Sequence, residues 1–129
     1  MNTRAWLSEI PWDMAVWQNQ QLCKPKNAHH GPTSDGHEPC RALWEQSHPL
    51  QMTLAEMVDL CRKCHRLAPF TNYNGNTFSA IARALIETLP LPPATLAVAR
   101  SLAHHIVAGV ASDEEVQAFR KFCEETTHP

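Results

Sequence analysis

The sequence predicts an all-α protein, a small bundle of four to five helices with one irregular loop near the N-terminus. Three observations lead to this prediction. Apolar residues recur at helical spacing along the second half of the chain. Two capping boxes, each a Thr or Ser followed three residues later by Glu, mark helix starts. A segment rich in His, Pro and Gly predicts the loop, because it can form neither a continuous helix nor a central strand.

We expect a single domain over residues 1–129, with a Trp-rich segment and loop (1–52) and a helical body (53–129). The length of 129 residues suffices for one modest core. A formal net charge of −2 gives no bulk attraction to nucleic acid or anionic membranes. No stretch is apolar and long enough to cross a bilayer or to act as a signal peptide. With an odd count of five cysteines, these features predict a cytoplasmic protein with reduced thiols and no membrane association.

The N-terminal segment contains three of the four tryptophans, Trp6, Trp12 and Trp17. Residues 12–21 contain no helix breaker, and Pro11 is acceptable in a first turn, so a short helix is expected there. Two interpretations of the indoles stay open. They can close over the core as a lid, or they can form a surface for a partner, because tryptophan is enriched at binding hot spots.

Residues 23–39 form the predicted loop, which is long for a compact domain. It contains three prolines and three histidines and is followed, at residues 41–50, by one or two expected helical turns. Loops of this length tend to be functional or disordered. A bound metal would hold the loop in place, which its composition alone would not.

The helical body begins with a capping box at Thr53 and Glu56, and Pro69 ends this helix near Leu67. An Asn-Gly turn at 74–75 should precede an amphipathic helix over residues 78–89 that is capped by Asn76 or Thr77.

Residues 94–108 are apolar around nearly the whole circumference of the predicted helix. Such a helix is buried, and in a short chain it can be buried against a second copy of the protein. The sequence therefore allows a homo-oligomer formed through this helix. Gly109 should end it, and a second capping box at Ser112 and Glu115 should start the last helix.

The most informative motif is the pentapeptide from Cys61 to His65, within the helix predicted over 53–67. Cys61, Cys64 and His65 fall at positions i, i+3 and i+4, so they share one helix face. Cys-x-x-Cys spacing in a reduced compartment usually indicates a metal. Tetrahedral zinc takes four Cys or His ligands, so we predict a zinc site at this motif.

The remaining ligands of that site would come from the ends of the loop. The preferred set combines the two cysteines of the motif with Cys40 and with either Cys23 or His37. His65 is a further candidate.

Other interpretations of the same thiols stay open. Free cysteines are often small, buried core residues. Cys61 and Cys64 could also be a redox pair, although a reactive pair normally occupies a helix N-terminus. Cys-x-x-Cys-His is also the attachment pattern of c-type haem. An iron–sulfur cluster on Cys23, Cys40, Cys61 and Cys64 is the remaining alternative.

The string Leu60-Cys61-Arg62-Lys63-Cys64-His65 resembles the second zinc knuckle of HNH-type endonucleases. The resemblance covers these six residues. It implies a metal-dependent nuclease with a catalytic histidine on a hairpin between two knuckles, and His37 is the candidate general base. The chain departs from the family in having single cysteines at 23 and 40 in place of a first knuckle.

No P-loop, dinucleotide-binding fingerprint, nucleophile elbow or paired-carboxylate motif occurs in the chain, so no catalytic residue is assigned. The first functional hypothesis is a metal-stabilised helical protein that binds a partner protein as an adaptor, regulator or assembly factor. The alternative is a nuclease or nucleic-acid binder, in which Arg62, Lys63 and Arg66 contact phosphates.

Overall fold

The computed structural model describes residues 2–126 and confirms the all-α class. The elements are α1 (Trp12–Cys23), the short 3-10 helix η1 (Lys24–Lys26), α2 (His37–Ser47), α3 (Leu54–Leu67), α4 (Asn74–Ile86), α5 (Pro93–Ala108) and α6 (Asp113–Thr126). Within residues 2–126 there is no strand, only two isolated bridges that pair Arg4 with Met52 and Pro32 with Phe70. Six α-helices therefore replace the four to five expected.

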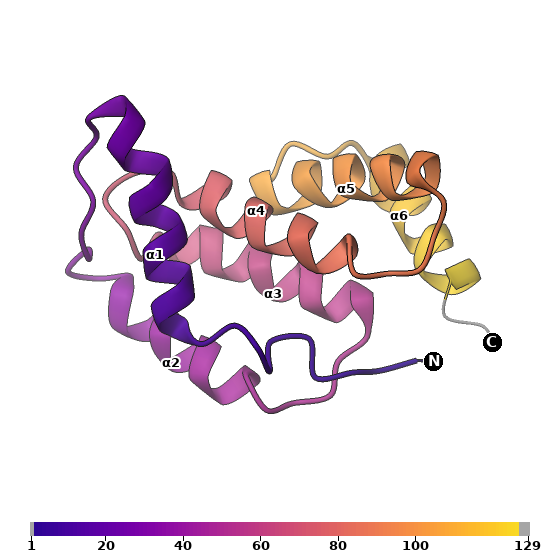
Figure 1. Ribbon diagram of the computed structural model, residues 1–129, viewed down its shortest axis with the longest axis horizontal. Coiled ribbons are helices and arrows are strands. Elements are labelled where there is room, and N and C mark those ends of the chain that lie inside the picture. Colours follow the sequence, from indigo (N-terminus) through magenta and orange to yellow (C-terminus); the bar gives the residue numbers. More distant parts are fainter. Residues whose placement is uncertain (1, 127–129) are drawn as a thin grey trace.

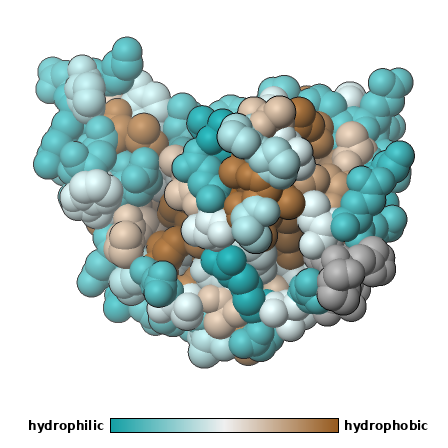
Figure 2. All heavy atoms as spheres, turned by 45° about the vertical axis from the view of Figure 1, so that its right-hand side comes forward, coloured by the Kyte–Doolittle hydropathy of each residue, from teal (hydrophilic) through white to brown (hydrophobic). Residues whose placement is uncertain are grey.

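Helices α3, α4 and α5 pack on one another and form the centre of the molecule (Figure 1). Helix α1 crosses the end of this group against α4, α2 lies along α3, and α6 covers α5. On the face shown in Figure 2, hydrophobic side chains gather in recesses between hydrophilic ridges. No helix in the described part of the chain combines the length and apolar character that a membrane span requires.

The predicted capping boxes are present and fix two helix starts. The Thr53 hydroxyl accepts the Glu56 backbone N–H at 3.1 Å, and the Glu56 carboxylate accepts the Thr53 N–H at 2.9 Å. Ser112 and Glu115 exchange the same two bonds at 3.1 Å each. Helix α5 ends at Gly109, whose φ of 80° is the left-handed conformation that glycine adopts without strain.

The irregular segment is shorter than predicted. Helix α1 continues to Cys23 and α2 already begins at His37, so only the residues between η1 and α2 lack helical structure. Pro39 falls in the first turn of α2, where its missing N–H has no intrahelical partner to lose. The prediction of a loop over the whole of 23–39 was therefore wrong at both ends.

Hydrogen bonds to the segment after α3 hold the loop in place. The Thr33 N–H donates to the Pro69 carbonyl and the Thr71 N–H to the Gly31 carbonyl, both at 3.0 Å. The Asn72 amide donates to the His29 carbonyl at 2.9 Å. These bonds connect the loop to a distant part of the chain and restrain it without a metal.

Helix α4 starts earlier than predicted, at Asn74. The Asn74 side chain donates to the Phe70 carbonyl at 2.8 Å and accepts the Phe70 N–H at 2.9 Å, which closes the preceding loop. Tyr73 takes the left-handed conformation at the helix start, with φ of 58°. Caps at Asn76 and Thr77 are therefore excluded, because both residues lie inside the helix.

Aromatic rings connect the N-terminal half of the chain to the central helices. Trp12 stacks on Phe70 with ring centroids 5.6 Å apart, and Phe70 stacks on Phe78 at 6.2 Å. Trp44 lies against Phe78 at 5.9 Å. Pairs in such geometries add about 1 kcal/mol each beyond the burial of their area. Helix α1 is thereby fixed to α2 and α4.

Candidate functional site

Three of the predicted metal ligands come together in the core. Cys40 comes from α2, and Cys61 and Cys64 come from successive turns of α3. All three are fully buried in the main hydrophobic cluster. The Cys40 sulfur lies 4.0 Å from the Cys64 carbonyl oxygen. We call these three residues the thiol cluster.

The surroundings raise the pKa of two thiols of the cluster, Cys61 and Cys64. Burial, with the nearby Cys40, raises the pKa of the Cys61 thiol to about 12. A hydrogen bond with Cys40, and then burial, raises the pKa of Cys64 as well. The thiolate is the form that binds zinc, and apolar surroundings disfavour it.

The other predicted ligands lie elsewhere. Cys23 is buried on α1, where its thiol contacts the Asn19 side chain and the His29 carbonyl, each at 3.8 Å. The His37 ring packs edge-on against Trp12 at 5.5 Å. Neither side chain lies with the thiol cluster.

His65 contacts different helices from those that hold the thiol cluster. Its Nδ1 donates to the Val107 carbonyl near the end of α5 at 2.7 Å. Its ring also lies against the first turn of α4, where a Cβ on Gly75 would be 3.1 Å from the imidazole. The ring therefore ties α3 to α4 and α5.

The structure thus does not assemble the predicted zinc ligands. No group of three or more His, Cys, Asp or Glu side chains among residues 2–126 is arranged to hold a metal ion. The three thiols that do meet are enclosed in the hydrophobic core, and the pKa values of two of them, Cys61 and Cys64, are raised. None of the other proposed ligands joins them as a fourth. These residues do not fit a zinc site as they stand, and we derive no chemistry through a metal.

The basic residues of the motif have separate roles. The Arg62 guanidinium lies at the C-terminal end of α5, 3.5 Å from the Val107 carbonyl oxygen. Its positive charge is attracted there by the negative end of the helix dipole. Lys63 pairs with Asp59 one turn earlier, at 4.0 Å, and Arg66 is exposed. Because one of these cations caps a helix, only two project to solvent. His37, the residue suggested by the HNH resemblance, lies at the start of a helix.

The tryptophans differ in exposure. Trp6, Trp12 and Trp44 are buried. The indole N–H of Trp6 donates to the Met52 carbonyl at 3.0 Å, and that of Trp44 to the Ile10 carbonyl at 2.8 Å. Trp17 is different, because 54% of its surface is exposed. Three indoles therefore belong to the core, and one is exposed.

Trp17 belongs to a continuous exposed face of α1. Asp13 and Met14 precede it by four and three positions, so the three side chains lie side by side. Met14 is 46% exposed. Residues 14–23 carry no charged side chain, although 19% of the chain is charged. We call Asp13, Met14 and Trp17 the α1 face.

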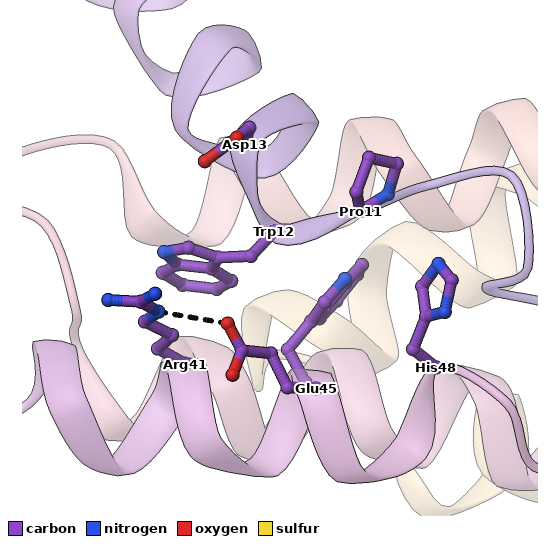
Figure 3. A pocket seen from close by; sticks show the side chains of 7 residues that line it. Pro11, Trp12, Asp13, Arg41, Glu45 and His48 are labelled. Carbon is purple, nitrogen blue, oxygen red and sulfur yellow. Dashed lines mark hydrogen bonds and ion pairs between the residues drawn. The ribbon is translucent and has the colours of Figure 1, made fainter.

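A hollow of about 280 Å³ adjoins the α1 face (Figure 3). Its lining comes from the start of α1 and one side of α2: Pro11, Trp12, Asp13, Arg41, Trp44, Glu45 and His48. Arg41 and Glu45 form an ion pair at 2.9 Å beside the Trp12 ring. His48 Nε2 is buried and has no hydrogen-bond partner among the described residues. No local pattern in the sequence predicts this hollow, because its two walls are distant in the chain.

Comparisons with protein-family models, with curated proteins and with solved structures found no match to this chain.

Proposed function

We propose that this protein acts by binding a partner protein through the α1 face and the adjoining hollow, as an adaptor, regulator or assembly factor. The exposure of Trp17 is the observation that supports this proposal. An indole that is 54% exposed beside an exposed methionine leaves apolar area in water at some free-energy cost. Interface cores are enriched in Trp and Met and depleted of charge, which is the composition of residues 14–23.

The charges around the hollow indicate the chemistry of the partner. Asp13 and Glu45 present carboxylates, and the one cation of the lining, Arg41, is already paired with Glu45 and lies 4.0 Å from Glu38. Negative charge therefore exceeds positive charge at this rim. We expect the partner to offer an apolar side chain to Trp17 and a Lys or Arg to the hollow.

The test compares partner recovery by variants of equal stability. Trp17→Ala removes the exposed indole, and truncation of a tryptophan hot spot costs about 2 kcal/mol, or roughly thirtyfold in Kd. Val110→Ala is the matched control, because Val110 is 69% exposed in the turn before α6. Affinity purification from the source cells, with quantitative mass spectrometry, should show a protein that is lost with Trp17→Ala and kept with Val110→Ala. Identical recovery by both variants would refute the proposal.

Self-association through α5 is a separate proposal. Ala99, Ala103 and Val107 face the core, whereas Val98 is 60% exposed on the opposite side. Sedimentation equilibrium of wild type and Val98→Asp tests it. A dimer that the aspartate dissociates supports an α5 interface, and a monomer at high concentration rules it out.

A further inference from the structure

A second hollow, of about 290 Å³, lies between α4 and α5. Its lining consists of Arg83 from α4 and Ala97, Arg100, Ser101 and His104 from α5. The α5 residues fall at i, i+3, i+4 and i+7, so they form one stripe along the helix. No carboxylate belongs to this lining, in contrast to the hollow beside the α1 face.

We propose that Arg83, Arg100, Ser101 and His104 form a binding site for a phosphate monoester group. Two guanidinium groups, a hydroxyl and an imidazole offer at least four donor groups to the three terminal oxygens of such a group. A planar carboxylate has only two oxygens and would leave donors unused. The volume exceeds that of phosphate itself, which leaves room for the organic part of the ester.

The ring of His104 contains a polar atom that the described part of the fold leaves without a hydrogen bond. Its Nδ1 is buried and has no hydrogen-bond partner among the described residues. We therefore assign the proton to Nε2, which is not among the buried unpartnered atoms. The adjacent His105 differs, because it pairs with Glu115 of α6. An Nε2–H directed to the hollow would be satisfied by an anion.

Arg83 is also without a counter-charge. The ion pairs formed among residues 2–126 do not include it. Arg100 does have a partner, the Glu87 carboxylate. A guanidinium carries five N–H donors, so this pair leaves Arg100 able to bind an oxyanion, with part of its charge neutralised. Among the described residues, the site therefore has one guanidinium without an ion-pair partner, Arg83, and one, Arg100, that is shared with Glu87.

The charges around His104 give the site a dependence on pH. Burial, then Arg83 of α4 and His105 of α5, lowers the pKa of His104. Arg100 of α5 lines the same hollow, and the acidic groups of the neighbouring helices, Glu87 and Glu115, are both engaged in ion pairs. A bound dianion would oppose these effects and favour protonation of the ring. Anion affinity should therefore rise as the pH falls.

The experiment is a titration of the full-length protein with inorganic phosphate and with phosphoserine, followed by the imidazole NMR signals. The His104 signal should move and saturate, while that of His105 moves little. Arg83→Gln should weaken binding about tenfold, the usual effect of losing a charge-assisted hydrogen bond. Arg66→Gln is the control, because Arg66 is an exposed arginine that does not line the hollow, and it should have no effect.

Glu87→Gln should tighten binding by about threefold, because it releases Arg100 from its ion pair. A misfolded variant would lose affinity, so a gain cannot be an effect of misfolding. Sulfate, which stays a dianion, should bind more tightly at lower pH in the wild type and lose this dependence in His104→Gln. A phosphoserine peptide that binds more tightly than phosphoserine would assign the site to a phosphoprotein, and equal affinities would assign it to a small phosphate ester. Equal weakening by Arg83→Gln and Arg66→Gln, or no saturable shift of His104, would overturn the proposal.

Discussion

Replacement of Cys61 by alanine separates a packed thiol from a metal ligand. The side chain is fully buried. Removal of its sulfur loses about the transfer free energy of one methylene, about 0.8 kcal/mol, and leaves a small cavity. We therefore expect Cys61→Ala to cost about 1 kcal/mol of unfolding free energy, or about 4 °C in Tm for a chain of this size. Cys61→Ser should cost more, because its hydroxyl is placed near a Met57 sulfur, a weak acceptor at 4.0 Å from the native thiol.

A structural zinc site gives a much larger effect, because apparent zinc-binding free energies reach about 10 kcal/mol or more and are coupled to folding. The assay is urea unfolding of each variant together with elemental analysis of the untagged protein. Cys123→Ala is the control, because Cys123 is a buried cysteine that is not among the proposed metal ligands. One equivalent of zinc in the wild type, lost with Cys61→Ala and accompanied by destabilisation of more than about 4 kcal/mol, would refute the reasoning from packing.

Three further predictions concern how the helices are held together. Gly36→Ala should destabilise the fold by more than about 3 kcal/mol in urea unfolding, because a Cβ there would lie 1.9 Å from the Leu67 carbonyl oxygen. Gly31→Ala is the control and should change stability little, because the nearest atom to its Cβ would be 3.4 Å away. Equal effects of the two variants would show that the start of α2 does not approach the end of α3 this closely. The hydrogen bond from His105 of α5 lowers the pKa of Glu115 below its ordinary value of 4.5. The ionised Glu115 therefore stabilises the fold above pH 4.5, and this stabilisation is lost as the pH falls through the lowered pKa. Glu115→Gln should therefore reduce Tm near pH 7 and leave it unchanged near pH 2, whereas a constant difference would contradict the ion pair. Asn19→Ala removes the side-chain hydrogen bonds to the Asn72 carbonyl, at 2.7 Å, and to the Thr77 hydroxyl, at 3.0 Å, from a residue that is 1% exposed. It should lower the free energy of unfolding by about 2 to 4 kcal/mol, measured with a chemical denaturant. A change under about 0.5 kcal/mol, the usual size for a surface residue, would show that Asn19 does not anchor α1.

Local signals in the sequence predicted the helical body well. The capping boxes at Thr53 and Ser112 and the glycine at 109 act within a few residues, so they retain their meaning in any tertiary context. The apolar stripe from Phe78 to Ile86 forms the buried side of α4, although the helix ends at Ile86 and not at the predicted residue 89. The predicted loop is too long because Pro39 breaks a helix only in the helix interior, whereas it lies in the first turn of α2, which accepts proline.

The candidate sites depend on contacts between distant segments, and the sequence does not display these. Cys-x-x-Cys spacing placed Cys61 and Cys64 on one helix face, and Cys40, which the sequence analysis grouped with them, does lie beside them in the structure. The spacing did not show that this face points into an apolar core, which decides the protonation state of the thiols. It also did not show that His65 turns to α5. The hollow between α4 and α5 was not predicted, because residues 94–108 are mostly apolar and its polar residues Arg100, Ser101 and His104 are few among them.

The most direct test of the proposed function places a photo-crosslinking amino acid at position 17 of the full-length protein in its source cells. The same substitution at position 110, which is also exposed but lies in the turn before α6, is the control. We predict a discrete crosslinked product from position 17 that is absent from position 110 and contains a second, different protein. No product at position 17, or the same products from both positions, would contradict the assignment of the α1 face as the partner surface.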